Sequence, residues 1–423
     1  MKSEELRKFF LDFFSQRGHK IVPSSSLVPL DDFSVLLTTA GMQQFKKYYT
    51  REKNPEADFN SQRVVSIQKC FRTTDIEEIG DETHLTFFEM LGNFSFGPVE
   101  KDDPLDFKTG GYFKKSAIYW AYDFFQKLGL KIDYVTVFKG EGGVNFDEES
   151  FNIWLEIGID REKILKRGKE DNFWGPTGEE GPCGPTTEIY LEGIEVWNLV
   201  FNEYYKDKNG RISKLKYPGV DTGMGLERLM KFIQGKETIF DTDLFEDLFN
   251  YLNSVSKVND LRKKRIIVDH LRGAVFLVAD GLYPSNLERG YVLRRILRKL
   301  TLNLKFLNLN LENLQNLITL IIKKYKDFYP ELRNFIKIKK VIFDEISAFE
   351  KTLKFGMNQF YKKIKGNENE EEIAEKLFFL YTSYGLPLEI SKEILKENKF
   401  IWTERSQTKF EQLFKKHQQI SKK

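Results

Sequence analysis

Hydrophobic residues at intervals of three and four positions predict a helix at the start of the chain. The apolar stripe consists of Leu6, Phe9, Phe10, Phe13 and Phe14. This spacing places all five side chains on one helix face, which indicates a helix packed against a core. Ser3 is expected to cap the helix and Gly18 to end it.

Short apolar runs in the next 190 or so residues predict strands. The runs are Val64–Ile67, Leu85–Phe88, Tyr134–Phe138, Thr187–Leu191 and Val196–Phe201. Long loops rich in turn residues separate most of these runs. Such loops favour antiparallel pairing over repeated strand–helix–strand crossovers.

Helical spacing dominates the second half of the chain. Apolar residues keep this spacing over Leu244–Leu252, Leu293–Leu300 and Val341–Leu353. Of the 29 glycines and 12 prolines, 23 and 9 lie in residues 1–240, so the remainder has few helix breakers. We therefore expect an α+β domain over residues 1–238, with an antiparallel sheet flanked by helices, and an all-helical domain over residues 239–423.

Composition excludes several classes of protein. The 423 residues are 41% hydrophobic and 30% charged, as in globular domains, and no run of about 18 apolar residues could span a membrane. Two cysteines, Cys70 and Cys183, are too few for a disulfide scaffold and fit a reducing cytoplasm. The four histidines form no pair at zinc-ligand spacing, so no zinc is predicted. No GxxxxGK[ST] phosphate loop occurs, so arginines, carboxylates and backbone amides are expected to carry the chemistry.

Two segments combine positive charge with aromatic rings or glycines. Lys69–Gly80 and the returning His84–Gly97 place Arg72 and the ring of Phe88 on one predicted sheet surface. In Val220–Leu229 a glycine-containing strand runs into a helix that begins with an arginine. Small residues let a ligand approach the backbone, and the arginine can stack on a base or pair with phosphate. Both segments indicate nucleotide chemistry.

Five sequence words, in this order, resemble the alanyl-tRNA synthetases, a family of class II aminoacyl-tRNA synthetases. They are TFFEMLGNFSFG at 86–97, DNFW at 171–174, GPCGP at 181–185, DTGMGLER at 221–228 and RGYVLRR at 289–295. The resemblance extends from the first helix to about Pro387. It implies ATP-dependent ligation of L-alanine to tRNA-Ala through an alanyl-adenylate, by a class II catalytic domain followed by a helical domain for the tRNA acceptor stem.

The resemblance assigns ATP-binding roles to residues of both segments. Arg72 is expected to bind the α-phosphate, and Phe88 and Arg228 are expected to enclose the adenine ring; the two arginines are the expected catalytic residues. The other residues expected to bind ATP are Gly223, Gly225 and Glu89. Regular strand alternation nevertheless puts Glu89 on the opposite face from Phe88. Magnesium is expected to come with ATP, bound largely through phosphate oxygens.

The resemblance also assigns an alanine site. Asp221 is expected to hold the ammonium group, and a methyl-sized pocket is expected from Trp174, Asn198 and Val200. Glu188 and Glu195 are the nearest candidates for contacts with magnesium or polar substrate atoms. Such a pocket rejects glycine by only about 1–3 kcal/mol, and an added hydroxyl is also hard to exclude. We therefore expect glycyl or seryl mischarging unless a separate protein edits in trans.

Basic residues gather in residues 261–305, which hold 11 Lys and Arg against three acidic residues, while the whole chain carries only +3. Arg294 and Arg298 are four positions apart and suited to tracking phosphates from one helix face. The residues expected to bind tRNA are Asn286, Arg289, Arg294, Arg295 and Arg298. The resemblance makes Asn286 the reader of a G·U wobble pair. A second reader, an aspartate in the family, is Thr382 here, so weaker discrimination of that pair is expected.

Members of the family continue into an editing domain and then an oligomerising domain, and this sequence has neither. Because the oligomerising segment is missing, the chain is expected to be a monomer. The low cysteine content favours the cytoplasm. Three alternatives stay open: a catalytically silent tRNA-binding relative, a truncated chain that needs missing domains, and an enzyme for another small amino acid. The presence of Arg72, Asp221 and Arg228 favours the ligase.

Overall fold

The computed structural model describes residues 1–29, 35–176, 178–366 and 368–421. The chain divides into two compact units, Met1–Asn250 and Tyr251–Lys423. No helix of the described residues is long and apolar enough to cross a membrane.

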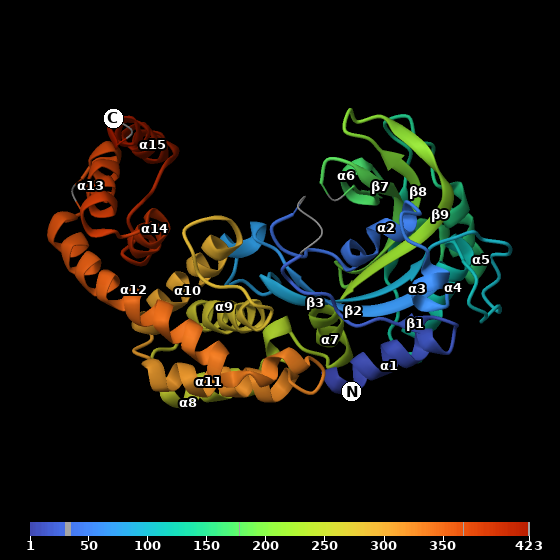
Figure 1. The fold of residues 1–423 in the computed structure, drawn as a ribbon, viewed down its shortest axis with the longest axis horizontal. Coiled ribbons are helices and arrows are strands. Elements are labelled where there is room, and N and C mark those ends of the chain that lie inside the picture. Colours follow the sequence, from blue (N-terminus) through green and yellow to red (C-terminus); the bar gives the residue numbers. More distant parts are fainter. Residues whose placement is uncertain (30–34, 177, 367, 422–423) are drawn as a thin grey trace. The chain divides into compact units, whose positions relative to one another are not determined.

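The first unit is built on a mixed sheet of nine strands in the order β1-β2-β3-β9-β8-β7-β4-β5, with β6 paired to β7 (Figure 1). The strands are β1 Lys20–Ile21, β2 Arg63–Phe71, β3 Phe87–Ser95, β4 Tyr134–Phe138, β5 Ile164–Arg167, β6 Phe173–Trp174, β7 Gly181–Leu191, β8 Ile194–Lys206 and β9 Ile212–Gly225. Among the strands of the described residues, only the β1–β2 and β4–β5 pairs are parallel. The predicted α+β fold with a largely antiparallel sheet is confirmed.

The helices and short helical turns of this unit connect and cover the strands. They are α1 Ser3–Ser15, α2 Lys46–Tyr49, α3 Pro55–Phe59, α4 Lys114–Lys127, α5 Glu148–Ile157, α6 Lys169–Asn172 and α7 Leu226–Ile233. The predicted passage from strand to helix at Val220–Leu229 is confirmed, because β9 continues directly into α7.

Helix α1 carries the predicted apolar stripe, but its N-terminus differs from the prediction. Lys2 occupies the cap position. Ser3 lies in the first turn, where its hydroxyl and backbone amide donate to Asp243 at 2.9 and 3.0 Å. The residues between Ser15 and Gly18 form a turn, and Gly18 has the positive φ of +79° expected where a helix is terminated.

Helices α1 and α4 cover one side of the sheet (Figure 1), and their aromatic side chains form a core with those of β8. The ring of Phe10 on α1 lies 6.2 Å from that of Trp197 on β8, and Phe124 on α4 lies 5.6 Å from the same indole. All three are buried, and each contributes about 1.5–3 kcal/mol by leaving water. This packing fixes β8 in place from one side and leaves its other side for a ligand.

The second unit is helical, and α8 Glu246–Val255 crosses the boundary between the units. Its other helices are α9 Leu261–Ala279, α10 Glu288–Phe306, α11 Leu311–Tyr325, α12 Phe335–Lys363, α13 Glu370–Tyr384, α14 Leu388–Glu397 and α15 Glu404–Ser421. Helix α12 is one continuous helix of 29 residues (Figure 1). Apolar residues of α12, α13 and α14 form one core cluster that includes Leu353, Leu377 and Ile394.

Candidate active site

A cavity of about 280 Å³ opens on the sheet face opposite Trp197. Because side chains alternate along a strand, every second residue of neighbouring strands faces it. These residues are Phe88 and Met90 on β3, Glu188 on β7, Asn198 and Val200 on β8, and Asp221, Gly223 and Gly225 on β9. The register pairs Val200 with Asp221 and Asn198 with Gly223, so the strands place the predicted residues side by side.

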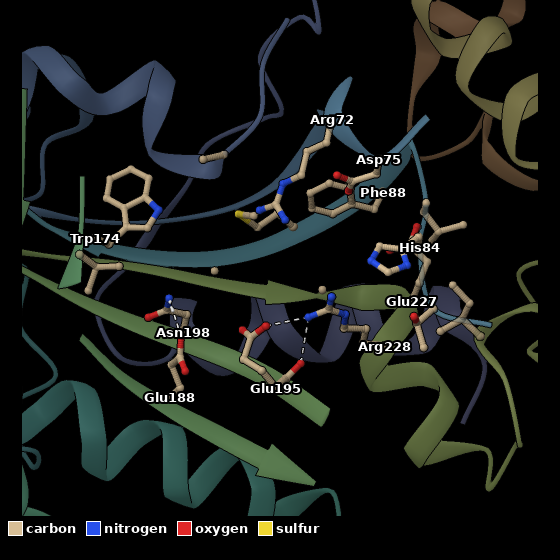
Figure 2. A pocket seen from close by; sticks show the side chains of 18 of the residues that line it. Arg72, Asp75, His84, Phe88, Trp174, Glu188, Glu195, Asn198, Glu227 and Arg228 are labelled. Atoms are coloured by element: carbon tan, nitrogen blue, oxygen red, sulfur yellow. Dashed lines mark hydrogen bonds and ion pairs between the residues drawn. The ribbon is translucent and has the colours of Figure 1, made fainter. Parts of the chain in front are cut away.

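Arg72 and Phe88 meet at one end of the cavity (Figure 2). Arg72 directly follows β2, and its backbone amide donates to Thr86 at 2.8 Å. The Arg72 guanidinium lies 4.9 Å from the centre of the Phe88 ring, within cation–π range. This places an exposed cation and a half-buried ring at the same edge of the cavity.

Arg228 lies one turn into α7 and reaches back over the sheet. Its Nη1 donates to Oε2 of Glu195 at 2.6 Å and to the Glu195 carbonyl at 3.1 Å (Figure 2). Both side chains are about one-third exposed. The guanidinium is therefore held at the cavity by a residue of β8, with its plane still open to a ligand.

Asp221 is a buried acid on the β9 side of the cavity. Its side chain belongs to a residue only 6% exposed, and removal from water raises the pKa of this carboxyl to about 7. A buried carboxylate is strongly stabilised by an arriving cation because no solvent competes for it. The geometry suits an ammonium group.

Glu188 and Asn198 form a polar pair beside Asp221. The Asn198 amide donates to Oε1 of Glu188 at 3.3 Å, and the Tyr190 hydroxyl donates to Oε2 at 2.7 Å (Figure 2). Burial raises the pKa of Glu188 to about 7. The buried Oδ1 of Asn198 has no hydrogen-bond partner among the described residues, so it is available to accept a bond from a ligand.

Trp174 and the glycines define the size of the cavity. Trp174 on β6 borders the cavity (Figure 2), and Val200 on β8 also lines it. A Cβ added at Gly223 would lie 2.9 Å from the sulfur of Met90, closer than real contacts allow, whereas one at Gly225 would find its nearest atoms at 3.8 Å. Gly223 is therefore the position where a side chain would intrude.

Glu89 is a correction to the predicted set. It does not line the cavity, because it points through the opposite face of β3 toward α1. There it accepts two hydrogen bonds from Arg7, at 2.7 and 2.5 Å, with both side chains buried. This buried pair ties α1 to the sheet and places the Glu89 carboxylate on the face of β3 away from the cavity.

The structure adds His84, Asp75 and Glu227 to the cavity, which the sequence analysis did not assign (Figure 2). His84 contacts Asp81 through Nδ1 and lies 3.1 Å from Glu78 through Nε2. Both ring nitrogens of His84 therefore face carboxylates at the rim of the cavity. His84 precedes Phe88 by four residues on the same arm of the predicted hairpin. This even spacing was the sequence signal that both side chains could lie on one face.

The acids of the cavity suit magnesium that is bound mainly through phosphate. Glu188 accepts from Tyr190 and Asn198, and Glu195 pairs with Arg228. Within the described part of the chain, no group of three or more His, Cys, Asp or Glu side chains could hold a metal ion. Mg²⁺ commonly uses one or two carboxylates plus substrate phosphates, and the donor set fits that pattern.

The basic segment of the second unit is less exposed than its sequence suggests. Five of its eleven basic residues are buried: Lys263, Lys264, Arg265, Arg272 and Lys299. Lys263 pairs with Asp260 and Glu397, and Arg272 donates to Tyr325. These five side chains are enclosed within the helical unit, so they do not present their charge to RNA.

Arg294 and Arg298 share one face of α10, as predicted. Their Nε atoms lie 2.9 and 3.6 Å from the same oxygen of Glu345 on α12. Arg289 and Arg295 are partly exposed and Asn286 is exposed. Thr382 donates its hydroxyl to the carbonyl of Phe378 at 3.0 Å, so it can offer RNA only an acceptor.

Comparison with known proteins places the chain in a family. A family model described as tRNA synthetases class II (A) matches residues 5–423. The chain is therefore a member of the class II tRNA synthetases. Three curated relatives, each named alanine–tRNA ligase, come from Borrelia hermsii, Rubrobacter xylanophilus and a Thermotoga species, at 38, 40 and 41% identity. Within its class, the chain belongs to the alanyl-tRNA synthetases.

The relatives differ in how much of their length this chain spans. The Borrelia hermsii match covers 100% of this chain and 73% of the relative. The Rubrobacter and Thermotoga matches each cover 94% of this chain and 47% of the relative, so the chain spans about half the length of those proteins.

Solved structures give weaker matches. A pyrrolysyl-tRNA synthetase from Desulfitobacterium hafniense is 15% identical at a TM-score of 0.34, over 57% of this chain and 72% of that chain. An asparaginyl-tRNA synthetase from Entamoeba histolytica is 12% identical at a TM-score of 0.31, over 57% and 65%.

Proposed function

We propose that the chain activates L-alanine with ATP and transfers the alanyl group to tRNA-Ala. The observation that carries this proposal is the convergence of Arg72, Phe88, Asp221 and Arg228 on one cavity. Adenylate formation requires a cation that binds phosphate, two groups that hold the adenine ring and a buried acid that binds an ammonium group. The family of the chain and the names of its relatives support the same reaction.

In the first step, a carboxylate oxygen of alanine attacks the α-phosphorus of ATP. The new O–P bond forms as the bond to the bridging oxygen breaks, and pyrophosphate leaves with the electron pair. Arg72 would offset the negative charge that grows on the α-phosphate oxygens. Phe88 and Arg228 would hold the adenine between a ring and a guanidinium plane.

Alanine would be held by its ammonium group. Asp221 supplies a desolvated carboxylate, and the unpartnered Oδ1 of Asn198 supplies a second acceptor on the neighbouring strand. Trp174 and Val200 leave room for a small side chain. The cavity therefore favours a small α-amino acid whose carboxylate points toward Arg72.

In the second step, a hydroxyl of the terminal tRNA ribose attacks the alanyl carbonyl, and AMP leaves. The bond between the alanyl carbon and the phosphate oxygen breaks, and the hydroxyl proton passes to the leaving phosphate or to solvent. Neither step needs a dedicated histidine base, because the adenylate is a good leaving group and alignment supplies much of the rate. Magnesium bound to the phosphates would neutralise charge on the nucleotide. In the cell the reaction would take place in the cytoplasm.

Alanine-dependent exchange of pyrophosphate into ATP tests this function. We expect exchange with alanine and loss of at least 100-fold in kcat for Arg72→Ala. Arg161→Ala removes an exposed arginine outside the cavity and should leave exchange unchanged. No exchange above background with alanine, together with normal tRNA binding, would instead indicate a catalytically silent binder. Stronger exchange with glycine or serine would reassign the amino acid.

A further inference from the structure

Asn286, which the resemblance makes a base reader, does not stand alone in the structure. Its Oδ1 accepts a hydrogen bond from Nη1 of Arg294, one and a half turns into α10. Asn286 itself is exposed and precedes the helix. The side-chain amide of an exposed asparagine can present either its carbonyl oxygen or its amino group to a ligand. A protein partner that bonds to one of these two groups leaves the other for the ligand.

Arg294 is in turn fixed by a residue of another helix. Its Nε and Nη2 donate to the two oxygens of Glu345 on α12, at 2.9 and 3.1 Å. Such a two-bond fork fixes the guanidinium plane as well as its position. Glu345 is only 12% exposed and Arg294 19%, so solvent weakens this pair little.

The same carboxylate also limits what Arg294 can do. Three nitrogens of its guanidinium are used inside the protein, and Glu345 offsets part of the charge that Arg294 and Arg298 carry together. A phosphate would have to compete with a nearly buried carboxylate for this arginine. The structure therefore favours a positioning role for Arg294 over the predicted tracking of phosphates.

We propose that Glu345, acting through Arg294, orients the amide of Asn286 so that its Nδ2 group faces RNA as a hydrogen-bond donor. The matching ligand is a minor-groove acceptor, a purine N3 or a pyrimidine O2. Without the Glu345–Arg294 fork, the amide is free to rotate and present its carbonyl as often as its amino group. Glu345 is thus a positioning residue for base reading, and this inference depends on the proposed tRNA ligation.

Two matched variants separate this role from a general charge effect. Glu345→Gln removes one acceptor of the fork. Asp344→Asn makes the same change of carboxylate to amide at the preceding residue, which pairs with Lys340 at 2.8 Å. Aminoacylation is measured with acceptor-stem RNA carrying G·U or G·C at the wobble position. We expect Glu345→Gln to lower kcat/KM for the G·U RNA about tenfold and to reduce the preference for G·U over G·C. Asp344→Asn should change neither.

Alanine-dependent pyrophosphate exchange is measured on the same samples, because it uses the first unit alone. Exchange at wild-type rate in Glu345→Gln shows that the proposed activation of alanine holds in this variant. An unchanged helical circular-dichroism signal and unfolding midpoint show that the second unit, which contains Glu345, is folded. Loss of exchange in the wild type would contradict the function itself, whereas unchanged G·U preference in Glu345→Gln would overturn only the inference about Glu345.

A double-mutant cycle tests whether Glu345 acts through Asn286. Adding Glu345→Gln to Asn286→Ala should cause no further loss of G·U preference, and additive losses would refute the relay. Replacing the purine N3 by CH, or removing the pyrimidine O2, tests the donor assignment. One of these changes should reduce wild-type charging about tenfold and affect Glu345→Gln little. Full wild-type charging of both altered RNAs would refute the assignment.

Discussion

Nη1 of Arg228 lies 2.6 Å from Oε2 of Glu195, and the same nitrogen also donates to the Glu195 carbonyl at 3.1 Å. The guanidinium proposed to cover the adenine ring is thus held in place from β8 before any nucleotide arrives. Holding a long flexible side chain in its bound position reduces the entropy lost when the ligand binds.

The Glu195 contact predicts a modest effect on ATP affinity. Glu195→Gln should raise the KM for ATP about two- to fivefold, because a partly exposed ion pair contributes about 0.2–1 kcal/mol. The KM for alanine should stay constant. Glu192→Gln is the matched control, since Glu192 lies 3.6 Å from Lys231 and is 74% exposed. Equal changes in both variants would show that net charge, and not the Arg228 contact, is responsible.

The raised pKa of Asp221 predicts how alanine binding depends on pH. Its carboxyl has a pKa of about 7 in the protein, so it is protonated below that pH and cannot pair with an ammonium group. The kcat/KM for alanine in pyrophosphate exchange should fall about tenfold per pH unit below pH 6. Glu188 has a similarly raised pKa, and Glu188→Gln should leave this acid limb in place. Loss of the limb in that variant would assign it to Glu188.

Asp221 should also cost stability at neutral pH. Because its pKa is raised on folding, the unfolded chain releases this proton more readily, and stability falls as pH rises from about 4 through 7. Asp221→Asn removes this cost and should raise the free energy of unfolding by up to about 4 kcal/mol at pH 8. Denaturant unfolding at pH 4 and 8 measures it. An equal change at both pH values would contradict the linkage.

Gly223 and Gly225 on β9 should differ sharply in how well they tolerate an added side chain. Gly223→Ala would place a Cβ 2.9 Å from the Met90 sulfur and push that side chain within the cavity, so the KM for alanine should rise about tenfold. The Cβ added in Gly225→Ala would find its nearest atoms at 3.8 Å, so the KM for alanine should change less than twofold. Pyrophosphate-exchange assays on both variants measure this KM. Equal increases would show that lost backbone flexibility, and not the space for a Cβ, determines the KM for alanine.

Thr382 predicts weak discrimination of the wobble pair. Its hydroxyl is spent as a donor on Phe378 and brings no charge. Thr382→Asp should strengthen an acceptor contact with a base amino group and raise the preference for G·U over G·C about tenfold in aminoacylation. Thr382→Ala serves as the control and should lower the preference. A gain in Thr382→Ala would contradict the acceptor role.

Strand alternation and motif order were sufficient to predict most of the candidate site. Residues 221, 223 and 225 alternate along one predicted strand, so their common face followed from the sequence, and Tyr134–Phe138 matches β4 in full. The difficulty already visible for Glu89 was real, because alternation turns it toward Arg7. Contacts between distant segments, such as Arg7 with Glu89, have no local signal in one sequence.

The burial of charged side chains could not be predicted from the sequence. The basic segment 261–305 looked like a solvent-facing surface, yet Arg272 and Lys299 are buried. Their partners lie on helices far along the chain, such as Tyr325 and Glu393. Charge counts report composition, whereas exposure depends on which helix packs against which.

The direct passage of β9 into α7 has a consequence for how this segment can change. Asp221 and Arg228 are separated by six residues without an intervening loop. Inserting or deleting a single residue at the start of α7 would turn Arg228 by about 100° around the helix axis and away from the adenine position. Point substitutions can vary this stretch, but its length is set by the distance between two substrates.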